Sequence, residues 1–162
     1  MPETPLEIQV GDLLRVHNLT LVTAESCTGG LIGHLLTNVP GSSAYYLGGV
    51  VAYAYEAKVA LLGVDWETLQ KFGAVSEEVA LQMARGARAV LKGDIAVSVT
   101  GIAGPGGGMP NKPVGLTWIA LSTPDGDYAQ HFIWQGNREG NKQSSALAAL
   151  HMVIQYLQNQ PA

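Results

Sequence analysis

Residues 19–30 read LTLVTAESCTGG, and this stretch decides the fold. Its apolar, β-branched first half predicts a buried strand over residues 19–24. The glycines then open GGLIGHLLT, whose apolar residues predict a short helix over residues 29–37, before Pro40 and Gly41 break the chain. A strand, a tight turn and a helix in succession form the repeating unit of an α/β protein.

The rest of the chain continues this alternation of strands and helices. Apolar residues at helical spacing predict helices over residues 5–17, 56–62, 77–92 and 139–158. Gly63 is a suitable C-cap for the second of these helices, and Ser76 is a suitable N-cap for the third. Strands are expected over residues 47–55, 94–100, 114–121 and 128–134, and the last two, joined by PDGD, should be antiparallel. The prediction is one domain over residues 1–162, a three-layer α/β/α arrangement with a mixed sheet.

The composition excludes several classes of protein. The chain of 162 residues is 47% hydrophobic and 14% charged, with a net charge of −4 and no basic run, so we expect a globular protein that does not bind nucleic acid. It has neither a signal-like start nor an apolar stretch of about 18 residues, so we expect a cytoplasmic protein without a membrane segment. Cys27 is the only cysteine and no ligand cluster is evident, so we expect no disulfide, metal or cofactor.

The turn AESCTGG is the first candidate site. A helix N-terminus leaves backbone N–H groups unpaired and carries partial positive charge, so it can bind a phosphate or stabilise an oxyanion. Gly29 and Gly30 would let a ligand approach the backbone, and Ser26 or Thr28 could be a nucleophile or a ligand contact. The alternative is that Ser26 or Thr28 only caps the helix and that the glycines only pack it on the sheet. Cys27 has no evident histidine partner, which favours a small buried thiol.

A glycine-rich loop is the second candidate. GIAGPGGG follows a strand that ends at Thr100, and Gly101, Gly104, Gly106 and Gly107 could wrap backbone donors around an anion. A flexible connection would explain the same glycines, because neither GxGxxG spacing nor a helix directly after the loop is present.

Three further positions carry reactive or charged side chains. Lys58 lies in the first turn of an apolar helix, where a neutral lysine could be the general base for a serine, with Tyr53 relaying the proton. An exposed surface lysine is the more common case. Ser43 lies in PGSSAYY, where small polar residues also suit a plain turn. Arg138 could clamp a phosphate or a carboxylate, or simply lie in the first turn of the last helix.

Taken together, these motifs resemble one family. The ordered set is AESCTGG, PGSSAYYLGGVVAY with Lys58 five residues after Tyr53, GAVSEEVA, and SVTGIAGPGGG followed by PVGLTWIAL. It is similar to the C-terminal domain of the competence/damage-inducible protein CinA, the nicotinamide-nucleotide amidohydrolase family. The resemblance covers roughly residues 5–158, with the motifs in the family's order and spacing.

The resemblance implies a reaction and a set of site residues. The reaction is hydrolysis of the carboxamide of nicotinamide mononucleotide to nicotinate mononucleotide and ammonia, a step in pyridine nucleotide recycling, and relatives suggest a homodimer or a larger homo-oligomer. The catalytic positions carried over by motif are Ser26, Ser43, Tyr53 and Lys58. The substrate-binding positions are Thr100, Arg138 and the glycines around residues 29–30 and 101–108, with Thr28 beside them.

The hypothesis is serine-type amide hydrolysis without a histidine. Ser26 is favoured as the nucleophile because a helix N-terminus lies beside it, and the opposite assignment makes Ser43 the nucleophile. A binding module that holds a nucleotide or another anion without turnover is the alternative function. The chain departs from the family at Tyr55, where a small polar residue is usual, and at Lys142, where a second arginine is usual, which bears on ligand affinity.

Overall fold

The centre of the molecule is a mixed sheet. The computed structural model describes residues 2–161, and in that range the strands form one five-stranded sheet in the order β2-β1-β3-β4-β5. The strands are β1 (Leu21–Glu25), β2 (Tyr46–Val51), β3 (Ile95–Gly101), β4 (Leu116–Thr123) and β5 (Gly126–Ile133). β1 runs parallel to both β2 and β3, whereas β4 is antiparallel to β3 and to β5. The predicted mixed sheet and the antiparallel end of the chain are therefore confirmed.

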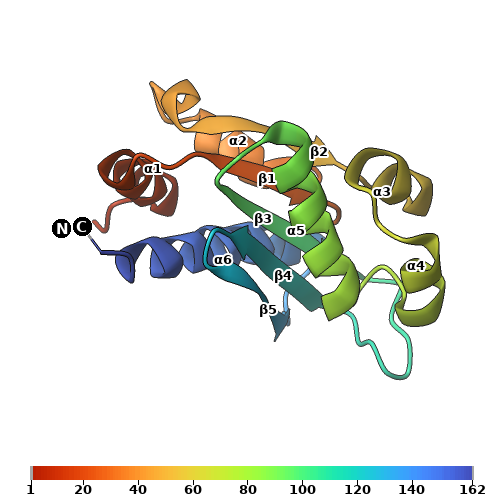
Figure 1. Cartoon of the computed structure of the whole chain (residues 1–162). Helices are drawn as coiled ribbons and strands as arrows, with labels where there is room; N and C mark the ends of the chain where they lie inside the picture. The colour runs from red at the N-terminus through yellow and green to blue at the C-terminus, as the bar shows by residue number, and fades with distance from the viewer. Residues whose placement is uncertain (1, 162) are drawn as a thin grey trace.

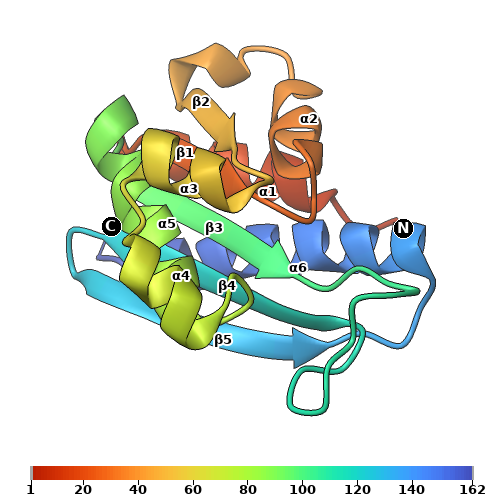
Figure 2. The same cartoon turned by 90° about the vertical axis from the view of Figure 1, so that its right-hand side faces the viewer.

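Helices cover both faces of the sheet, which makes three layers (Figures 1 and 2). The helices are α1 (Leu6–His17), α2 (Leu31–Thr37), α3 (Tyr55–Leu62), α4 (Trp66–Phe72), α5 (Glu77–Leu91) and α6 (Arg138–Gln158), with a 3-10 turn η1 (Ser42–Ala44) before β2. One buried cluster joins α1, α2 and α6 to one face, and a second joins α3, α4 and α5 to the other. The strands β1 and β3 are buried on both faces, as their near-continuous apolar sequences require.

Local signals explain where most helices begin and end. The Ser76 side chain accepts a hydrogen bond from the N–H of Val79 and so caps α5, as expected. Gly63 ends α3 with a φ of 66°, which glycine adopts without strain. Two expectations differ from the structure: β2 ends at Val51 rather than at residue 55, and the sequence did not indicate α4.

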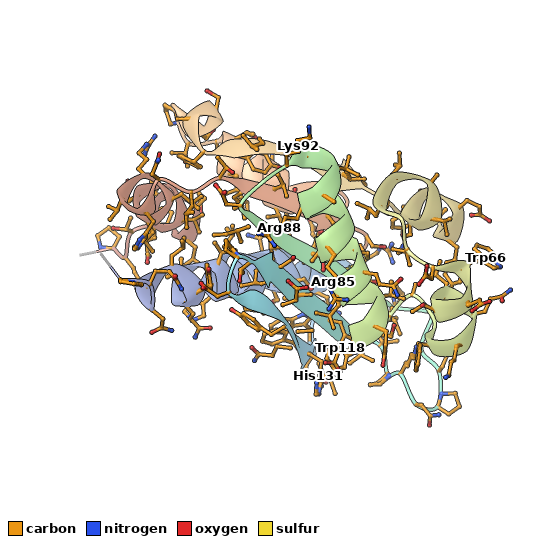
Figure 3. The ribbon with its side chains drawn as sticks, viewed as in Figure 1. Trp66, Arg85, Arg88, Lys92, Trp118 and His131 are labelled. Carbon is orange, nitrogen blue, oxygen red and sulfur yellow. The ribbon has the colours of Figure 1, made fainter. Side chains whose placement is uncertain are left out.

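α5 is the long helix on one face of the sheet. It passes so close to the end of α3 that a Cβ at Gly86 would lie 1.8 Å from the carbonyl oxygen of Leu62. Arg85, Arg88 and Lys92 follow one another along this part of the chain (Figure 3), and Arg85 pairs with Asp127 of β5 at 2.6 Å. These basic side chains line a shallow pocket together with Ser122 and Asp127, and Arg85 is tied to the neighbouring strand.

The parallel strands β1, β2 and β3 all end at the same edge of the sheet. In open α/β sheets, ligands bind in the crevice outside the carboxyl ends of such strands. The turns that follow these strands begin at Ser26, Ala52 and Ile102, so the candidate residues Ser26, Tyr53 and Gly104 come from this edge. In residues 2–161, no helix combines the length and the apolar character needed to cross a bilayer.

Candidate active site

A pocket of about 270 Å³ opens where the three parallel strands end. Its size is close to the lower end of the ~300–1,000 Å³ range typical of small-molecule sites. The described residues that line it include two basic side chains and neither a carboxylate nor a histidine. They are Ser26, Cys27, Tyr53, Lys58, Ala74, Val75, Thr100, Gly101, Ile102, Ala103, Gly104, Gly106, Gly107 and Arg138. Nine of the thirteen residues expected at the site are among them, and the pocket suits an anionic small molecule.

Lys58 and Ser26 are in direct contact at the base of this pocket. The Nζ of Lys58 lies 3.0 Å from the Oγ of Ser26, 2.9 Å from the carbonyl oxygen of Ala52 and 3.2 Å from the carbonyl oxygen of Tyr53. A neutral amine has two N–H donors and one lone pair. If the two carbonyl groups take the two donors, the lone pair faces the serine hydroxyl, so the geometry orients Lys58 to accept the proton of Ser26.

The surroundings of Lys58 favour its neutral form. Its side chain is 1% exposed, and among the described residues no carboxylate forms an ion pair with it. Burial lowers the pKa of the Lys58 ammonium, because desolvation penalises the charged form. The exposed surface lysine, the more common reading of the sequence, is therefore not what the structure contains.

Ser26 directly follows β1. Its N–H donates to the carbonyl oxygen of Val99 on β3, which fixes the start of the turn, and its side chain is buried. In the described part of the chain, the N–H groups of Cys27 and Thr28 donate to no backbone or side-chain acceptor. Of the two, Cys27 lies in the pocket lining immediately after the serine, so its N–H is available to an oxyanion. Burial raises the pKa of the Cys27 thiol to about 12, so this thiol stays protonated and is a poor nucleophile.

Glu25, the last residue of β1, occupies the N-terminus of α2. Its carboxylate is 2% exposed and accepts hydrogen bonds from the Thr28 hydroxyl at 2.7 Å, the Ile32 N–H at 2.9 Å and the Gly33 N–H at 3.0 Å. The helix end that the sequence suggested as an anion site is therefore already occupied by a negative charge.

Three expected binding residues consequently lie outside the pocket lining. Thr28 is bonded to Glu25, and Gly29 and Gly30 form the turn with φ angles of 61° and 103°. A residue with a Cβ adopts such angles only with strain, so the two glycines are explained by the turn itself. This is the structural alternative that the sequence left open for them.

Glu25 should be important for stability. Replacing Glu25 with alanine leaves one buried hydroxyl and two helix N–H groups without an acceptor, and we expect the free energy of unfolding to fall by about 2–4 kcal/mol. Urea denaturation followed by circular dichroism measures this change. Glu25→Gln keeps one acceptor oxygen and should lose less than Glu25→Ala. A change smaller than about 0.5 kcal/mol in Glu25→Ala would contradict the capping role.

Arg138 closes the pocket on the side of α6. Its Nη1 donates to the carbonyl oxygen of Gly104 at 2.8 Å, and its Nη2 donates to the Tyr53 hydroxyl at 3.0 Å. The guanidinium has five N–H donors, so three remain for a ligand. Arg138 thus holds the glycine-rich loop and the tyrosine together and still presents a positive charge to the pocket.

The far wall depends in part on Ala74 and Asn141, which the sequence does not single out. The Thr100 hydroxyl donates to the carbonyl oxygen of Ala74 at 2.8 Å, and the N–H of Ala74 donates to the Tyr55 hydroxyl at 3.3 Å. Buried Asn141 donates to the carbonyl oxygen of Ala103 at 3.0 Å. Tyr55, a departure from the family pattern, therefore supports this wall. Asn141 and Ala103 are 38 positions apart in the chain, so their hydrogen bond leaves no local signal in the sequence.

Ser43 does not reach this pocket within its own chain. It is exposed in η1, which precedes β2, whereas the pocket follows β2. The six residues of β2 span about 20 Å at ~3.3 Å per residue. Ser26, not Ser43, is therefore the serine that contacts Lys58.

The site can be compared with known proteins on this basis. The sequence profile of the CinA C-terminal domain family matches residues 3–157. The chain belongs to the CinA C-terminal domain family. A putative competence-damage inducible protein of Halothermothrix orenii is 47% identical over 156 residues, which are 96% of this chain and 38% of that protein. A CinA-like protein of Salinibacter ruber is 51% identical over 148 residues, 91% of this chain and 36% of that protein.

Solved structures of CinA proteins share the whole fold. A CinA superfamily protein of Klebsiella pneumoniae has a TM-score of 0.92 at 32% identity, covering 96% of this chain and 97% of that one. A competence/damage inducible protein of Agrobacterium tumefaciens has a TM-score of 0.87 at 41% identity, covering 98% and 100%. The chain spans little more than a third of the length of the two curated relatives described above. The CinA fold, and the three-layer mixed-sheet architecture expected from the sequence, are confirmed.

Proposed function

We propose that this CinA domain hydrolyses the carboxamide of nicotinamide mononucleotide to nicotinate mononucleotide and ammonia, in pyridine nucleotide recycling. The observation that carries the proposal is the 3.0 Å contact between the Ser26 hydroxyl and the Lys58 amine. A buried lysine without a carboxylate partner, hydrogen-bonded to a serine in a cationic pocket, supports acyl transfer from an anionic substrate.

The first half of the reaction transfers the acyl group to Ser26. The neutral amine of Lys58 takes the hydroxyl proton as the Oγ of Ser26 bonds to the carboxamide carbon. The oxygen of that carbon becomes an oxyanion, which the N–H group of Cys27 in the pocket lining stabilises. Lys58 then returns the proton to the nitrogen of the substrate, the C–N bond breaks, and ammonia leaves an ester on Ser26.

The second half releases the acid. Lys58 is neutral again after ammonia has left, so it can take a proton from a water molecule that attacks the ester carbon. The C–O bond to Ser26 breaks, and the serine oxygen recovers its proton from Lys58. The product is a carboxylate, and no histidine is needed at any step.

In this proposal the phosphate of the substrate binds beside Arg138 and the glycine-rich loop. Arg138 has three N–H donors left and lies against Gly104 of the glycine-rich loop. Gly106 and Gly107 line the same pocket as Arg138, and glycines let backbone groups approach a ligand closely. Phosphate groups are commonly bound by an arginine that donates two hydrogen bonds to the phosphate oxygen atoms.

Measuring the release of ammonia distinguishes an enzyme from a non-catalytic binding module. We expect the protein to release ammonia and nicotinate mononucleotide in a one-to-one ratio from nicotinamide mononucleotide, measured by a coupled ammonia assay and chromatography. Nicotinamide riboside, which lacks the phosphate, is the matched substrate and should react with a higher KM. Binding of the nucleotide in calorimetry without any product would instead support the non-catalytic module.

The pH dependence should reflect Lys58. The base must be neutral, so kcat/KM should rise with pH as Lys58 loses its proton, and burial lowers its pKa below the ordinary value of about 10.4. The ascending limb should therefore lie at lower pH than for an exposed lysine. Initial rates from about pH 5 to 10 measure this limb. The variant Arg138→Lys leaves Ser26 and Lys58 in place, so its kcat/KM should rise over the same pH range as that of the native protein. A rate that falls with rising pH throughout this range would contradict a lysine base.

A further inference from the structure

A second pocket lies beside the C-terminal half of α5, away from the candidate active site. Its volume is about 470 Å³, and its lining comes mainly from α5, the end of β4 and the start of β5. Ser122 in this lining pairs with Ala96 near the start of β3, whereas Thr100 of the active-site pocket lies near the end of that strand. The two pockets have no lining residue in common among residues 2–161, and they lie toward opposite ends of β3.

Basic side chains dominate this second pocket. Arg85, Arg88 and Lys92 recur at helical spacing, so they lie on one side of α5 (Figure 3). They are three of the nine lysines and arginines in the chain, and Asp127 is the one carboxylate among the described lining residues. The pocket therefore has an excess of two positive charges in a protein whose net charge is −4. Such a local excess attracts anions.

The two arginines are held in place by the neighbouring strands. The Nε of Arg85 donates to the carboxylate of Asp127 at 2.6 Å, and the Nη1 of Arg88 donates to the carbonyl oxygen of Thr123 at 3.1 Å. A guanidinium has five N–H donors, so most of the donors of both arginines are left for a ligand. Because these contacts already restrict the two side chains, binding an anion costs them little further conformational freedom.

Lys92 has a backbone conformation that favours glycine. It ends α5 with a φ of 55° and a ψ of 44°, and among the non-glycine residues of the described chain only Asn18 also has a positive φ. Glycine is the usual residue after a helix in this conformation, because a Cβ is strained there. The lysine also adds a third like charge to the pocket. A strained residue and gathered like charges are features of ligand sites rather than of stabilising contacts.

We propose that this pocket is a second, non-catalytic binding site for a small phosphorylated anion, such as pyrophosphate or a nucleoside diphosphate. An arginine donates paired hydrogen bonds that match the oxygen atoms of a phosphate, and a lysine ammonium adds charge without a fixed geometry. The free donors of Arg85 and Arg88 bind the phosphate, and Lys92 neutralises it from the end of the helix. A phosphate ester carries up to about two negative charges at neutral pH, which matches the excess of positive charge in the pocket.

The charges around the pocket favour a small ligand over a nucleic acid. Binding a nucleic-acid backbone requires an extended row or patch of basic side chains. The N-terminal turn of α5 instead carries Glu77 and Glu78, and the turn between β4 and β5 carries exposed Asp125. Acidic side chains therefore flank the three basic ones, and the positive charge does not extend along the surface in these directions.

Calorimetry with pyrophosphate tests this site without any assay of activity. Arg138→Gln is the background for the titrations, because it removes the arginine that the proposed function assigns to phosphate in the active-site pocket. Pyrophosphate should still bind this variant, and adding Arg88→Gln should weaken binding about tenfold or more, the cost of charged hydrogen bonds. Arg15→Gln removes an exposed arginine from α1 and is the matched control, which should change the affinity by less than about twofold.

Lys92→Gly separates binding from folding. Glycine relieves the backbone strain, so this variant should melt at the native temperature or above it, yet it should bind pyrophosphate about fivefold more weakly or worse. ADP as a second probe distinguishes the source of the phosphate: binding equal to that of pyrophosphate supports recognition of the phosphates alone, and tighter binding supports a nucleotide.

Three results would overturn the second site. The first is that neither pyrophosphate nor ADP binds with a dissociation constant below about 10 mM. The second is that Arg88→Gln and Lys92→Gly bind both probes as well as their background does. The third is that a single-stranded oligonucleotide binds more tightly than both probes and loses its affinity in the same two variants, which would assign the basic side chains to nucleic acid.

Discussion

Replacing Lys58 with methionine is expected to lower kcat for ammonia release by about 10⁴-fold or more. Methionine is of similar length and suits a buried site, but it has no lone pair to take the proton of Ser26. Removal of a base that acts with a nucleophile usually costs about as much as removal of the nucleophile itself. Steady-state ammonia release measures the loss, and circular dichroism with a melting curve shows whether the fold is kept.

The matched control for this variant is an exposed lysine. Lys71→Met on α4 removes the same charge from the surface and should leave kcat within about twofold. Lys58→Arg keeps a basic side chain, but a guanidinium cannot deprotonate near neutral pH, so this variant should be inactive as well. Turnover by Lys58→Met above about a tenth of the native rate would mean that Lys58 only packs the turn after β1.

Ser26→Ala should abolish turnover to a similar extent. The hydroxyl of Ser26 is the one side-chain oxygen in the described residues that Lys58 contacts, so its removal leaves the base without a nucleophile. The expected loss in kcat is about 10⁴-fold or more, with KM little changed because the phosphate contacts remain. Rapid-quench measurements of ammonia release separate the chemical step from product release.

Ser43→Ala distinguishes the two serines. Ser43 is exposed and lies outside the pocket of its own chain, so this variant should keep kcat/KM within about threefold of the native value. A Ser26→Ala variant with near-normal turnover beside an inactive Ser43→Ala variant would reverse the assignment. The double variant of Ser26→Ala and Lys58→Met should lose no more than either single variant, because the two residues act as a unit.

The alternation of strands and helices was predictable because it depends on local patterns. The run LTLV, the cap at Ser76 and the glycine at Gly63 each act within a few residues of the element that they define. α4 was not predictable in this way, because seven residues give only two turns and the helix has one buried residue, Leu69. The early end of β2 also has a tertiary cause: the chain turns at Ala52, which then bonds to Glu25 and Lys58.

The site could be predicted only in part, because its contacts join residues that are far apart in the sequence. The sequence indicated Ser26 and Lys58 as candidates, but their contact joins residues 32 positions apart and depends on β1 and β2 being neighbours. The role of Glu25 had a local signal, a carboxylate just before a helix N-terminus, which could have been recognised within AESCTGG. The support that Tyr55 and Asn141 give to the pocket wall could not be recognised from the sequence, because their hydrogen-bond partners are distant in the chain.

Covalent labelling tests the central claim most directly. If Ser26 is the nucleophile and Lys58 its base, then acid quenching during turnover of nicotinamide mononucleotide should trap an ester of the nicotinate product. Peptide mass spectrometry should find this adduct on Ser26, and Lys58→Met should form none. An adduct on Ser43, Thr100 or Cys27 instead of Ser26, or an adduct that forms equally well without Lys58, would contradict the account.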